Sequence, residues 1–596
     1  MSSDPADPTT PLPRVAAPRG LRAALAAAAV GLATGAHFLA GDGVRMVHPA
    51  AALVAYGLAV VLVLLATRAA APAPLAVPEP AWSRPEAALV AALTVGALLL
   101  RVVATGSIPP ALTGDEASAG LAAVDILEGR FDNVFGVSWY SFPGAYFLIP
   151  AGSIALFGAS FEALRIPSAI AGAATVTGIY LLARSLWGRR TATIAAVLLS
   201  TLHFHVHFSR IGLNNVWDGL LAVATLGLFW KGWRTGRRSH FVAAGILLGA
   251  SQYFYASGRL LPVLLASWIV LGLLIERRLP RARLVNLASM ALTAIVVFLP
   301  LGLFFFHHPD EYAAPMNRVT ILGQWLEESA RATGKPEWAL LLGNFRDAAT
   351  GFSTGPLRHW YRPGAPMLLA PAAFLFHAGL VLAVVRFLDP RPRLVLLWLA
   401  GVLAVGGLSE SAPASQRYVM GAPAAVLLAG WALASATSAA ERRWPRLRPA
   451  LFGIVALVLA GSSILDLDLY FRRYVRSGES LDDNTEVAMA LAARLAREPA
   501  GTRVYFLGPP RMGFASIPTL PYLAPHVVPT DVAEPLSAPP DWTRAPSSFF
   551  VVALPERVPE LSFIRASATS ALEQEVRGRG GQVLYTMIVV PASARR

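Results

Sequence analysis

Two adjacent carboxylates, Asp115 and Glu116, are the residues in this sequence best placed for acid–base chemistry. They follow an apolar stretch by about ten residues, in the segment Thr113-Gly114-Asp115-Glu116. A carboxylate near a low-dielectric boundary can have a raised pKa and accept a proton from a hydroxyl group. Acidic side chains also stabilise the first turn of a helix. The pair is therefore either a general base with its support or a helix cap.

Three arginines stand at the ends of apolar stretches: Arg210, Arg259 and Arg417. A charge placed close to a bilayer needs a partner. Each arginine either reaches the lipid headgroups or binds a phosphate or carboxylate with its planar fork. Neighbouring polar and aromatic residues complete the candidate binding set, namely Asn214, Tyr255 and Tyr418. The alternate histidines of 203–207 would spread around a helix axis, so they do not predict a metal site.

The composition indicates a membrane protein. Of the 596 residues, 55% are hydrophobic and 14% are charged, and the mean hydropathy is +0.54. Soluble domains carry roughly a quarter charged residues. There is no cysteine, which excludes disulfides and thiolate metal sites. The net charge of +14 comes mostly from arginines in short loops between apolar runs, so we expect no nucleic-acid partner.

Apolar runs of spanning length recur along the chain. Thirteen are predicted as spans, at 20–40, 49–67, 86–104, 163–187, 191–208, 214–230, 240–256, 260–275, 284–305, 367–387, 394–408, 418–438 and 449–467. Five basic loops, at 184–190, 231–238, 277–283, 386–393 and 442–448, fall on one side only if the apolar run 143–158 does not cross. Because basic loops stay in the cytoplasm, the N-terminus is predicted inside and Asp115 outside.

This topology divides the chain into three parts. Residues 1–19 are polar and proline-rich, and we expect a disordered cytoplasmic tail. Residues 20–470 form the transmembrane part, with external loops at 105–162 and 306–366. Residues 471–596 are predicted to form an extracytoplasmic α/β domain. Its expected elements are helices at 484–497 and 568–578 and strands at 502–507, 548–554 and 582–590.

Several motifs in this order resemble the GT-C glycosyltransferases, and more narrowly the protein O-mannosyltransferase and aminoarabinose-transferase group (glycosyltransferase family 39). They are Gly114-Asp115-Glu116, Gly158 with Ala-Leu-Arg-Ile-Pro-Ser at 163–168, Ile-Tyr-Leu-Leu-Ala-Arg-Ser-Leu-Trp-Gly-Arg-Arg at 179–190, Phe208-Ser209-Arg210, and the later Tyr255, Arg259 and Arg417-Tyr418. The resemblance is strongest over 86–275. It implies a multi-span bundle whose first external loop holds interfacial helices, as the charge bias independently suggests for 143–158.

The resemblance also implies a reaction. Such enzymes move a sugar from a polyprenyl-phosphate carrier to a glycan, lipid or protein acceptor outside the cytoplasm, here in a bacterial cell membrane. By resemblance Asp115 is the base, Glu116 supports it, and the sugar carbon is inverted. Arg210, Arg259 and Arg417 are candidates for the carrier phosphate. No cofactor is required; a divalent metal is compatible but not indicated.

One departure concerns the acceptor. Aminoarabinose transferases carry a Lys-Pro-Pro-like segment where this chain has Tyr140-Ser141-Phe142-Pro143-Gly144, without lysine. A lysine–phosphate contact and a lipid A acceptor are therefore not expected. The aromatic side chains of Trp139 and Tyr140 either stack on a sugar or anchor the loop at the interface. A transporter of lipid-linked saccharides is the alternative function, although it would call for mid-span charges and repeats.

Overall fold

The computed structural model describes residues 18–68, 81–277, 280–479, 481–544, 548–567 and 571–591. The predicted tail at 1–19 therefore lies almost wholly outside the described residues. A helix occupies each of the thirteen places predicted as spans. They are α1 (Arg19–Ala40), α2 (Pro49–Thr67), α3 (Arg84–Val102), α6 (Phe161–Trp187), α7 (Arg189–Thr201) with α8 (His203–Phe208), α9 (Asn215–Thr235), α10 (Arg238–Ala250), α11 (Leu260–Glu276), α12 (Arg281–His307), α16 (Ala370–Val385), α17 (Pro390–Gly407), α18 (Ala422–Arg443) and α19 (Arg448–Leu467).

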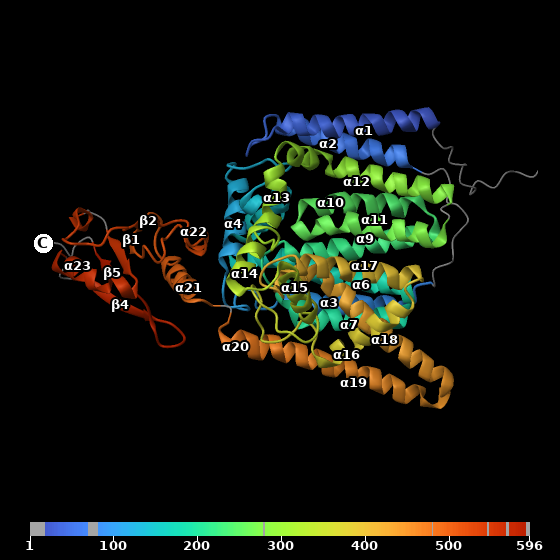
Figure 1. Ribbon diagram of the computed structural model, residues 1–596. Helices are drawn as coiled ribbons and strands as arrows, with labels where there is room; N and C mark the ends of the chain where they lie inside the picture. The colour runs from blue at the N-terminus through green and yellow to red at the C-terminus, as the bar shows by residue number, and fades with distance from the viewer. Residues whose placement is uncertain are drawn as a thin grey trace, which may run out of the picture.

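Eight of the described helices are long and apolar enough to cross a membrane: α1, α2, α3, α6, α11, α12, α18 and α19. A polytopic helical membrane protein is thus confirmed. The other five lie beside them in the same bundle (Figure 1) but are shorter or less apolar, so the number of thirteen spans stays a prediction. Ala- and Gly-rich helices fill the centre, where α18 is buried over most of its length. Small residues let helix backbones approach closely in a bilayer.

The helices of the two loops predicted to be external, 105–162 and 306–366, gather at one end of the bundle. They are α4 (Gly114–Leu127), α5 (Leu148–Phe157), α13 (Pro309–Asn317), α14 (Gln324–Thr333) and α15 (Glu337–Thr350). Figure 1 shows α4 lying across the ends of the long helices, while the connection from α18 to α19 lies at the opposite end. The apolar helix Gly144–Phe157 is shorter than the spanning helices and packs against α4 and α6. At 1.5 Å per residue it covers about 20 Å, as do α7 and α10 with 13 residues each, so the non-crossing of 143–158 stays a prediction.

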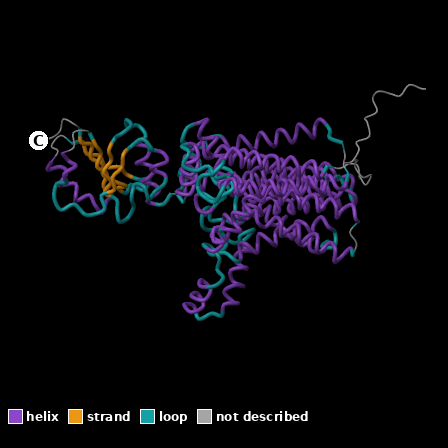
Figure 2. Tube along the Cα trace, turned by 90° about the horizontal axis from the view of Figure 1, so that it is seen from above, coloured by secondary structure: helices purple, strands orange, loops and turns teal. Residues whose placement is uncertain are grey.

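The C-terminal region contains a five-stranded mixed sheet in the order β2-β1-β3-β5-β4. Strand β1 pairs in parallel with β2 and β3, and β5 pairs antiparallel with β3 and β4. The elements are α20 (Val475–Ser477), α21 (Asp483–Leu495), β1 (Arg503–Leu507), α22 (Thr519–Leu523), β2 (Val528–Asp531), β3 (Phe549–Ala553), α23 (Leu561–Ser567), β4 (Leu572–Arg577) and β5 (Val583–Val590). Figure 2 shows the strands in a separate body beyond one end of the helical bundle. The predicted α/β character is confirmed.

One element of this region was predicted wrongly. The helix expected at 568–578 is the edge strand β4, which pairs with β5 over Leu572–Arg577; residues 568–570 lie outside the described part. Its sequence is rich in helix-forming residues, but the backbone hydrogen bonds offered by β5 override that preference. Strand β2 was not predicted, because it is only four residues long and contains Pro529. Proline is tolerated at a sheet edge, where β2 lies.

The C-terminal region docks on the loop that carries the acidic pair. The Tyr522 hydroxyl donates to the Ser160 carbonyl at 3.1 Å and accepts from the Ser160 N–H at 3.2 Å. The Thr519 hydroxyl donates to the Leu112 carbonyl at 3.2 Å. The Tyr522 ring lies over Gly120 of α4, so close that a Cβ at Gly120 would lie 2.5 Å from the ring. Glycine is therefore required here for the approach of α22 to α4.

Candidate functional site

The acidic pair begins helix α4, and its two members have different roles there. Thr113 is the N-cap: its hydroxyl accepts from the Glu116 N–H at 3.2 Å, and the Thr113 N–H donates to the Glu116 carboxylate at 3.2 Å. This reciprocal capping box satisfies two N–H groups that the first helical turn would leave unpaired. The helix-cap reading is thus correct for Glu116. Asp115, one residue earlier, takes no part in the cap and turns toward a pocket.

Glu116 is fully buried and forms an ion pair with Arg165 of α6, which is buried as well. The Arg165 Nε donates to Oε1 at 2.8 Å and its Nη2 donates to Oε2 at 3.1 Å. The Gly212 N–H donates to Oε1 at 2.8 Å. Because every oxygen of Glu116 is occupied by these donors, Glu116 fixes the position of α4 rather than facing a pocket.

Arg165 also holds the segment that leads into α4. Its guanidinium donates to the carbonyls of Thr105 at 2.7 Å and Pro109 at 2.8 Å, and to the carbonyl of Ala111. Sequence reasoning gave Arg165 no role beyond its place in a family motif. The sequence does contain a sign of this role, because Arg165 is a charged residue in the apolar run after residue 160 and such a residue needs a buried partner.

The Asp115 carboxylate lies where two pockets meet. The larger pocket has an empty volume of about 870 Å³, counting space open to solvent, and the smaller about 640 Å³. Asp115, His359 and Trp360 line both. Among the described residues, no hydrogen bond or ion pair engages the Asp115 side chain. A carboxylate free of protein partners between two pockets is available to a substrate on either side.

The surroundings of Asp115 favour its protonated form. Burial raises the pKa of the Asp115 carboxyl, and the negative charge of Glu116 raises it further. Both effects disfavour a second negative charge at the start of α4. A raised pKa makes a carboxylate a stronger base toward a hydroxyl proton.

Arg417 and Tyr255 face Asp115 across the larger pocket. The Arg417 Nη1 donates to the Tyr255 hydroxyl at 3.0 Å, and both side chains line the pocket. The Arg417 Nε is buried and has no hydrogen-bond partner among the described residues. Two of the candidate binding residues therefore come together here, although they are 162 positions apart in the chain.

Sequence reasoning missed three further titratable residues of this pocket: Arg318, His359 and Glu410. The Arg318 guanidinium lies 4.1 Å from the Tyr140 ring centre and donates to the Tyr140 carbonyl at 3.0 Å. Burial, followed by the charge of Arg417, lowers the pKa of His359, which favours a neutral imidazole. Arg318 and His359 fall in the external loop 306–366, where no spacing in the sequence set them apart from other surface residues.

Aromatic side chains line the same pocket, including the two for which a sugar-stacking role was considered. Trp139 and Tyr140 lie 5.5 Å apart between ring centres, and Phe142 lies 5.6 Å from Tyr255. The backbone of Tyr140 has φ +58°, a left-handed conformation that is uncommon for an aromatic residue. The contacts of Arg318 hold this turn against α13.

Four other candidate residues do not reach this pocket. Arg210 is fully buried, and its guanidinium donates to the carbonyls of Leu100 at 2.7 Å, Val103 at 2.8 Å and Ile108 at 2.9 Å. Arg259 lies 3.9 Å from the Tyr312 ring centre and donates to its carbonyl. The other two candidates, Tyr418 and Asn214, each donate one side-chain hydrogen bond to the backbone. The Tyr418 hydroxyl donates to the Ala348 carbonyl at 2.6 Å, and the Asn214 amide donates to the Phe254 carbonyl at 3.3 Å. A phosphate role for Arg210 and Arg259 stays a prediction that these contacts do not favour.

Fold and site together define a multi-pass helical membrane protein that holds an unpaired carboxylate in a pocket at one end of its helical bundle, with a mixed α/β region docked beside it. The resemblance to the glycosyltransferase family 39 group is confirmed. Residues 142–304 match the sequence family described as dolichyl-phosphate-mannose-protein mannosyltransferase. The matched segment includes Arg165, Tyr255 and Arg259; Asp115 and Arg417 lie outside it.

Solved structures share this fold. The crystal structure of ArnT from Cupriavidus metallidurans in the apo state aligns with a TM-score of 0.52 at 15% identity, over 86% of this chain and 99% of that one. The same protein bound to undecaprenyl phosphate aligns with a TM-score of 0.51 over 86% and 98%. Dolichyl-phosphooligosaccharide-protein glycotransferase 3 of Archaeoglobus fulgidus is 30% identical over 208 residues, 30% of this chain. The alignment spans 23% of the length of that relative.

Proposed function

We propose that this protein is a GT-C glycosyltransferase that moves a sugar from a polyprenyl-phosphate carrier to an acceptor outside the cytoplasm. The observation that carries the proposal is the unpaired Asp115 carboxylate at the junction of two pockets, with Arg417 on the wall of one of them. Two substrates can then approach the same carboxylate from different sides. The family match and the ArnT fold support the same class of reaction.

The reaction is a single displacement. Asp115 accepts the proton of an acceptor hydroxyl, and the hydroxyl oxygen forms a bond to the anomeric carbon of the sugar. The bond from that carbon to the phosphate oxygen breaks on the opposite face, so the configuration is inverted and polyprenyl phosphate leaves. Arg417 stabilises the negative charge on the leaving phosphate. Its fork has a free, buried Nε, and Tyr255 orients it.

The pocket walls suggest how each substrate is held. Trp139 and Tyr140 offer flat aromatic faces on which a sugar ring can stack. Arg318 and Arg417 place two positive charges in a pocket that also holds Asp115. Glu410, which lines the same larger pocket, is a hydrogen-bond acceptor for sugar hydroxyls. The sugar and the acceptor are to be determined by experiment.

We propose an external location for this site and for the C-terminal region. The five basic loops are cytoplasmic by their charge bias, and helix α4, whose first turn contains Asp115, lies at the end of the bundle opposite the α18–α19 loop (Figure 1). A bacterial cell membrane with a cytoplasmic N-terminus and about thirteen spans fits this arrangement. Transport of a lipid-linked saccharide is the alternative function, and it does not require a carboxylate base.

The test is replacement of Asp115 by Asn, which keeps the size of the side chain and removes the base. Matched membranes should carry Asp125→Asn, which changes an exposed acid on the same helix α4. Cell-envelope glycans of a deletion strain complemented by each variant are compared by mass spectrometry. We expect transfer to fall by about 10²–10⁴-fold with Asp115→Asn and to be unchanged with Asp125→Asn. Normal glycans in the Asp115→Asn strain would refute the base and favour transport.

A further inference from the structure

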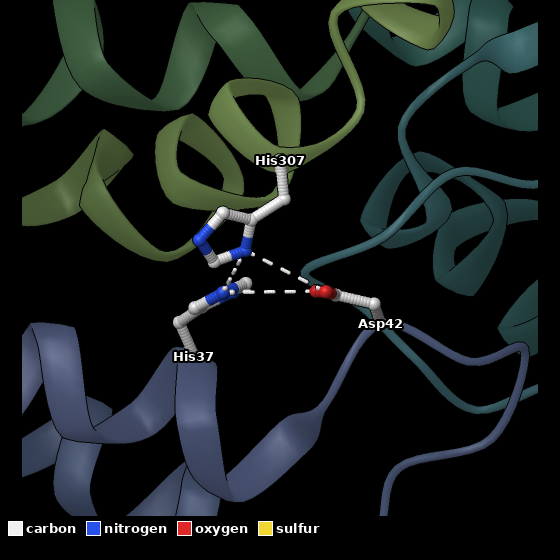
Figure 3. Close-up of side chains that lie close together, drawn as sticks. All are labelled: His37, Asp42 and His307. Carbon is white, nitrogen blue, oxygen red and sulfur yellow. Dashed lines mark hydrogen bonds and ion pairs between the residues drawn. The ribbon is translucent and has the colours of Figure 1, made fainter.

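Three side chains with metal-binding atoms converge at the end of α1, away from the pocket of Asp115. Figure 3 shows His37 of α1, Asp42 of the following loop and His307 at the end of α12 pointing toward one another. The His37 Nε2 lies 3.2 Å from the His307 Nδ1 and 3.6 Å from the Asp42 Oδ1. The His307 Nδ1 lies 3.5 Å from the Asp42 Oδ2. All three residues lie outside the family match at 142–304.

These separations fit a tetrahedral metal site. Zinc binds histidine nitrogen and carboxylate oxygen at about 2.0–2.2 Å, which places neighbouring ligand atoms of a tetrahedron about 3.3–3.5 Å apart. The two nitrogens lie 3.2 Å apart, and each lies close to one oxygen of Asp42, 3.6 Å from His37 Nε2 to Oδ1 and 3.5 Å from His307 Nδ1 to Oδ2, so the separations are near that range. Two imidazole nitrogens and a carboxylate are also a preferred zinc set that leaves one position for water. An octahedral ion with similar bond lengths would place adjacent ligands nearer about 3.0 Å.

The local backbone is built to hold this group. Gly41 ends α1 with φ +72°, and its N–H donates to the His37 carbonyl at 2.8 Å, so the chain reverses and Asp42 turns back over the helix end. The Asn133 side chain donates to the Gly41 carbonyl at 2.9 Å and to the Gly43 carbonyl at 2.7 Å. His37 is 2% exposed. Its position is thus fixed before any ion binds, which lowers the cost of assembling the site.

We propose that His37, Asp42 and His307 bind one Zn²⁺ ion. His308 contributes from the same side, since its Nε2 lies 3.4 Å from the Asp42 Oδ2 and has no hydrogen bond among the described residues. It either orients the carboxylate or occupies the fourth position. The site joins segments 270 positions apart and fastens the α1–α2 hairpin to the outer end of α12.

The ion would also stabilise one wall of the Asp115 pocket. Helix α13 starts directly after His308 and leads to Pro315 and Arg318, which line that pocket. On the other side, the Asp132 and Asn133 N–H groups donate to the Val44 carbonyl at 3.2 and 3.3 Å, and this segment leads to Trp139. Zinc bound between them therefore connects the two segments that carry Arg318 and Trp139.

Zinc binding can be measured on the whole chain, purified in detergent through a tag without histidine. The protein is stripped with EDTA and titrated with Zn²⁺, and bound metal is counted by elemental mass spectrometry. Co²⁺ serves as a spectroscopic probe, because its visible bands distinguish four- from six-fold coordination. We compare the unchanged chain with His307→Ala, which removes a half-exposed ligand, and with His48→Ala, which removes an exposed histidine near the same loop.

We expect one Zn²⁺ per chain, four-coordinate Co²⁺ bands, and a melting temperature that rises on adding Zn²⁺. His48→Ala should behave like the unchanged chain, and His307→Ala should weaken binding by at least tenfold. Absence of stoichiometric Zn²⁺ binding, or equal binding by His307→Ala and the unchanged chain, would overturn the proposal. None of these measurements involves sugar transfer, so they test the zinc site independently of the role proposed for Asp115.

Discussion

Replacing Arg165 by Met tests the claim that a buried ion pair positions the Asp115 loop. Arg165 and Glu116 are both fully buried, so the variant leaves the Glu116 charge without its only cationic partner among the described residues. Breaking a buried pair from one side costs about 3–5 kcal/mol, because the remaining charge is not solvated. At about 1.4 kcal/mol per decade, the folding equilibrium shifts by roughly 10²–10³-fold or more. The side chain lines neither pocket, so loss of transfer would be a positioning effect.

A double-mutant cycle separates the charge from the packing. Glu116→Gln in the same chain removes the orphaned charge but keeps an oxygen for the Gly212 N–H. What remains is the loss of donors to three carbonyls, those of Thr105, Pro109 and Ala111. At about 1 kcal/mol for each hydrogen bond, the double variant should cost about 3 kcal/mol and be up to about 2 kcal/mol more stable than Arg165→Met alone.

The assay is equilibrium unfolding of the detergent-purified variants, with hydrogen exchange of residues 105–112 as a local readout. Arg130→Met is the matched control, since Arg130 pairs with Asp125 and Glu128 on the surface of the same loop. Exposed pairs contribute about 0–1 kcal/mol. If Arg165→Met costs no more than Arg130→Met, or if the double variant is less stable than Arg165→Met, the buried pair does not hold the loop as described.

Three further outcomes follow from the site and its support. Burial and the charge of Glu116 raise the pKa of Asp115, and Asp115 must be deprotonated to act as the base. We therefore expect log kcat/KM to fall as the pH decreases, with a midpoint above the ordinary aspartate pKa of about 4. A midpoint at or below about 4 would contradict this. Tyr255→Phe removes the hydroxyl that orients Arg417 and should lower kcat/KM by about fivefold, but should have no added effect in Arg417→Ala; additive losses would separate the two residues. Tyr522→Phe removes both bonds to Ser160 and should increase hydrogen exchange at residues 158–162 by about tenfold, whereas unchanged exchange would mean that the docking does not depend on this hydroxyl.

The helical part of the fold could be predicted because bilayer length and charge bias act on single segments. Loop charges alone predict that the segment 143–158 does not cross, and this stays a prediction; in the structure it forms an apolar helix, Gly144–Phe157, shorter than the eight spanning candidates. Pairing between segments that are far apart in the chain is harder to predict from the sequence. Strand β4 reads as a helix because the partner that makes it a strand, β5, acts through backbone hydrogen bonds that its own side chains do not encode.

The candidate site was predicted in part, and the arginines show why. A charge at the outer end of a span was taken to indicate an external anion. That inference suits Arg417, whose fork borders the pocket, but it overlooked backbone carbonyls as partners. The end of α3 and the segment after it expose carbonyls that bind Arg210 from within the protein. Such groups belong to every residue type, so the sequence alone does not distinguish the two situations.

The docking of the C-terminal region bears on the choice between a catalyst and a scaffold that displays this region. A displayed module needs only a linker, yet Tyr522 packs on Gly120 of α4, the helix whose first turn contains Asp115, and Thr519 donates to the carbonyl of Leu112, just before the capping box. The loop is thereby held from three directions: by Arg165 from the bundle, by the Thr113 cap from within and by α22 from outside. So many constraints on one short turn are expected where one side chain must be held for chemistry. The side chain that these contacts leave unpaired is Asp115.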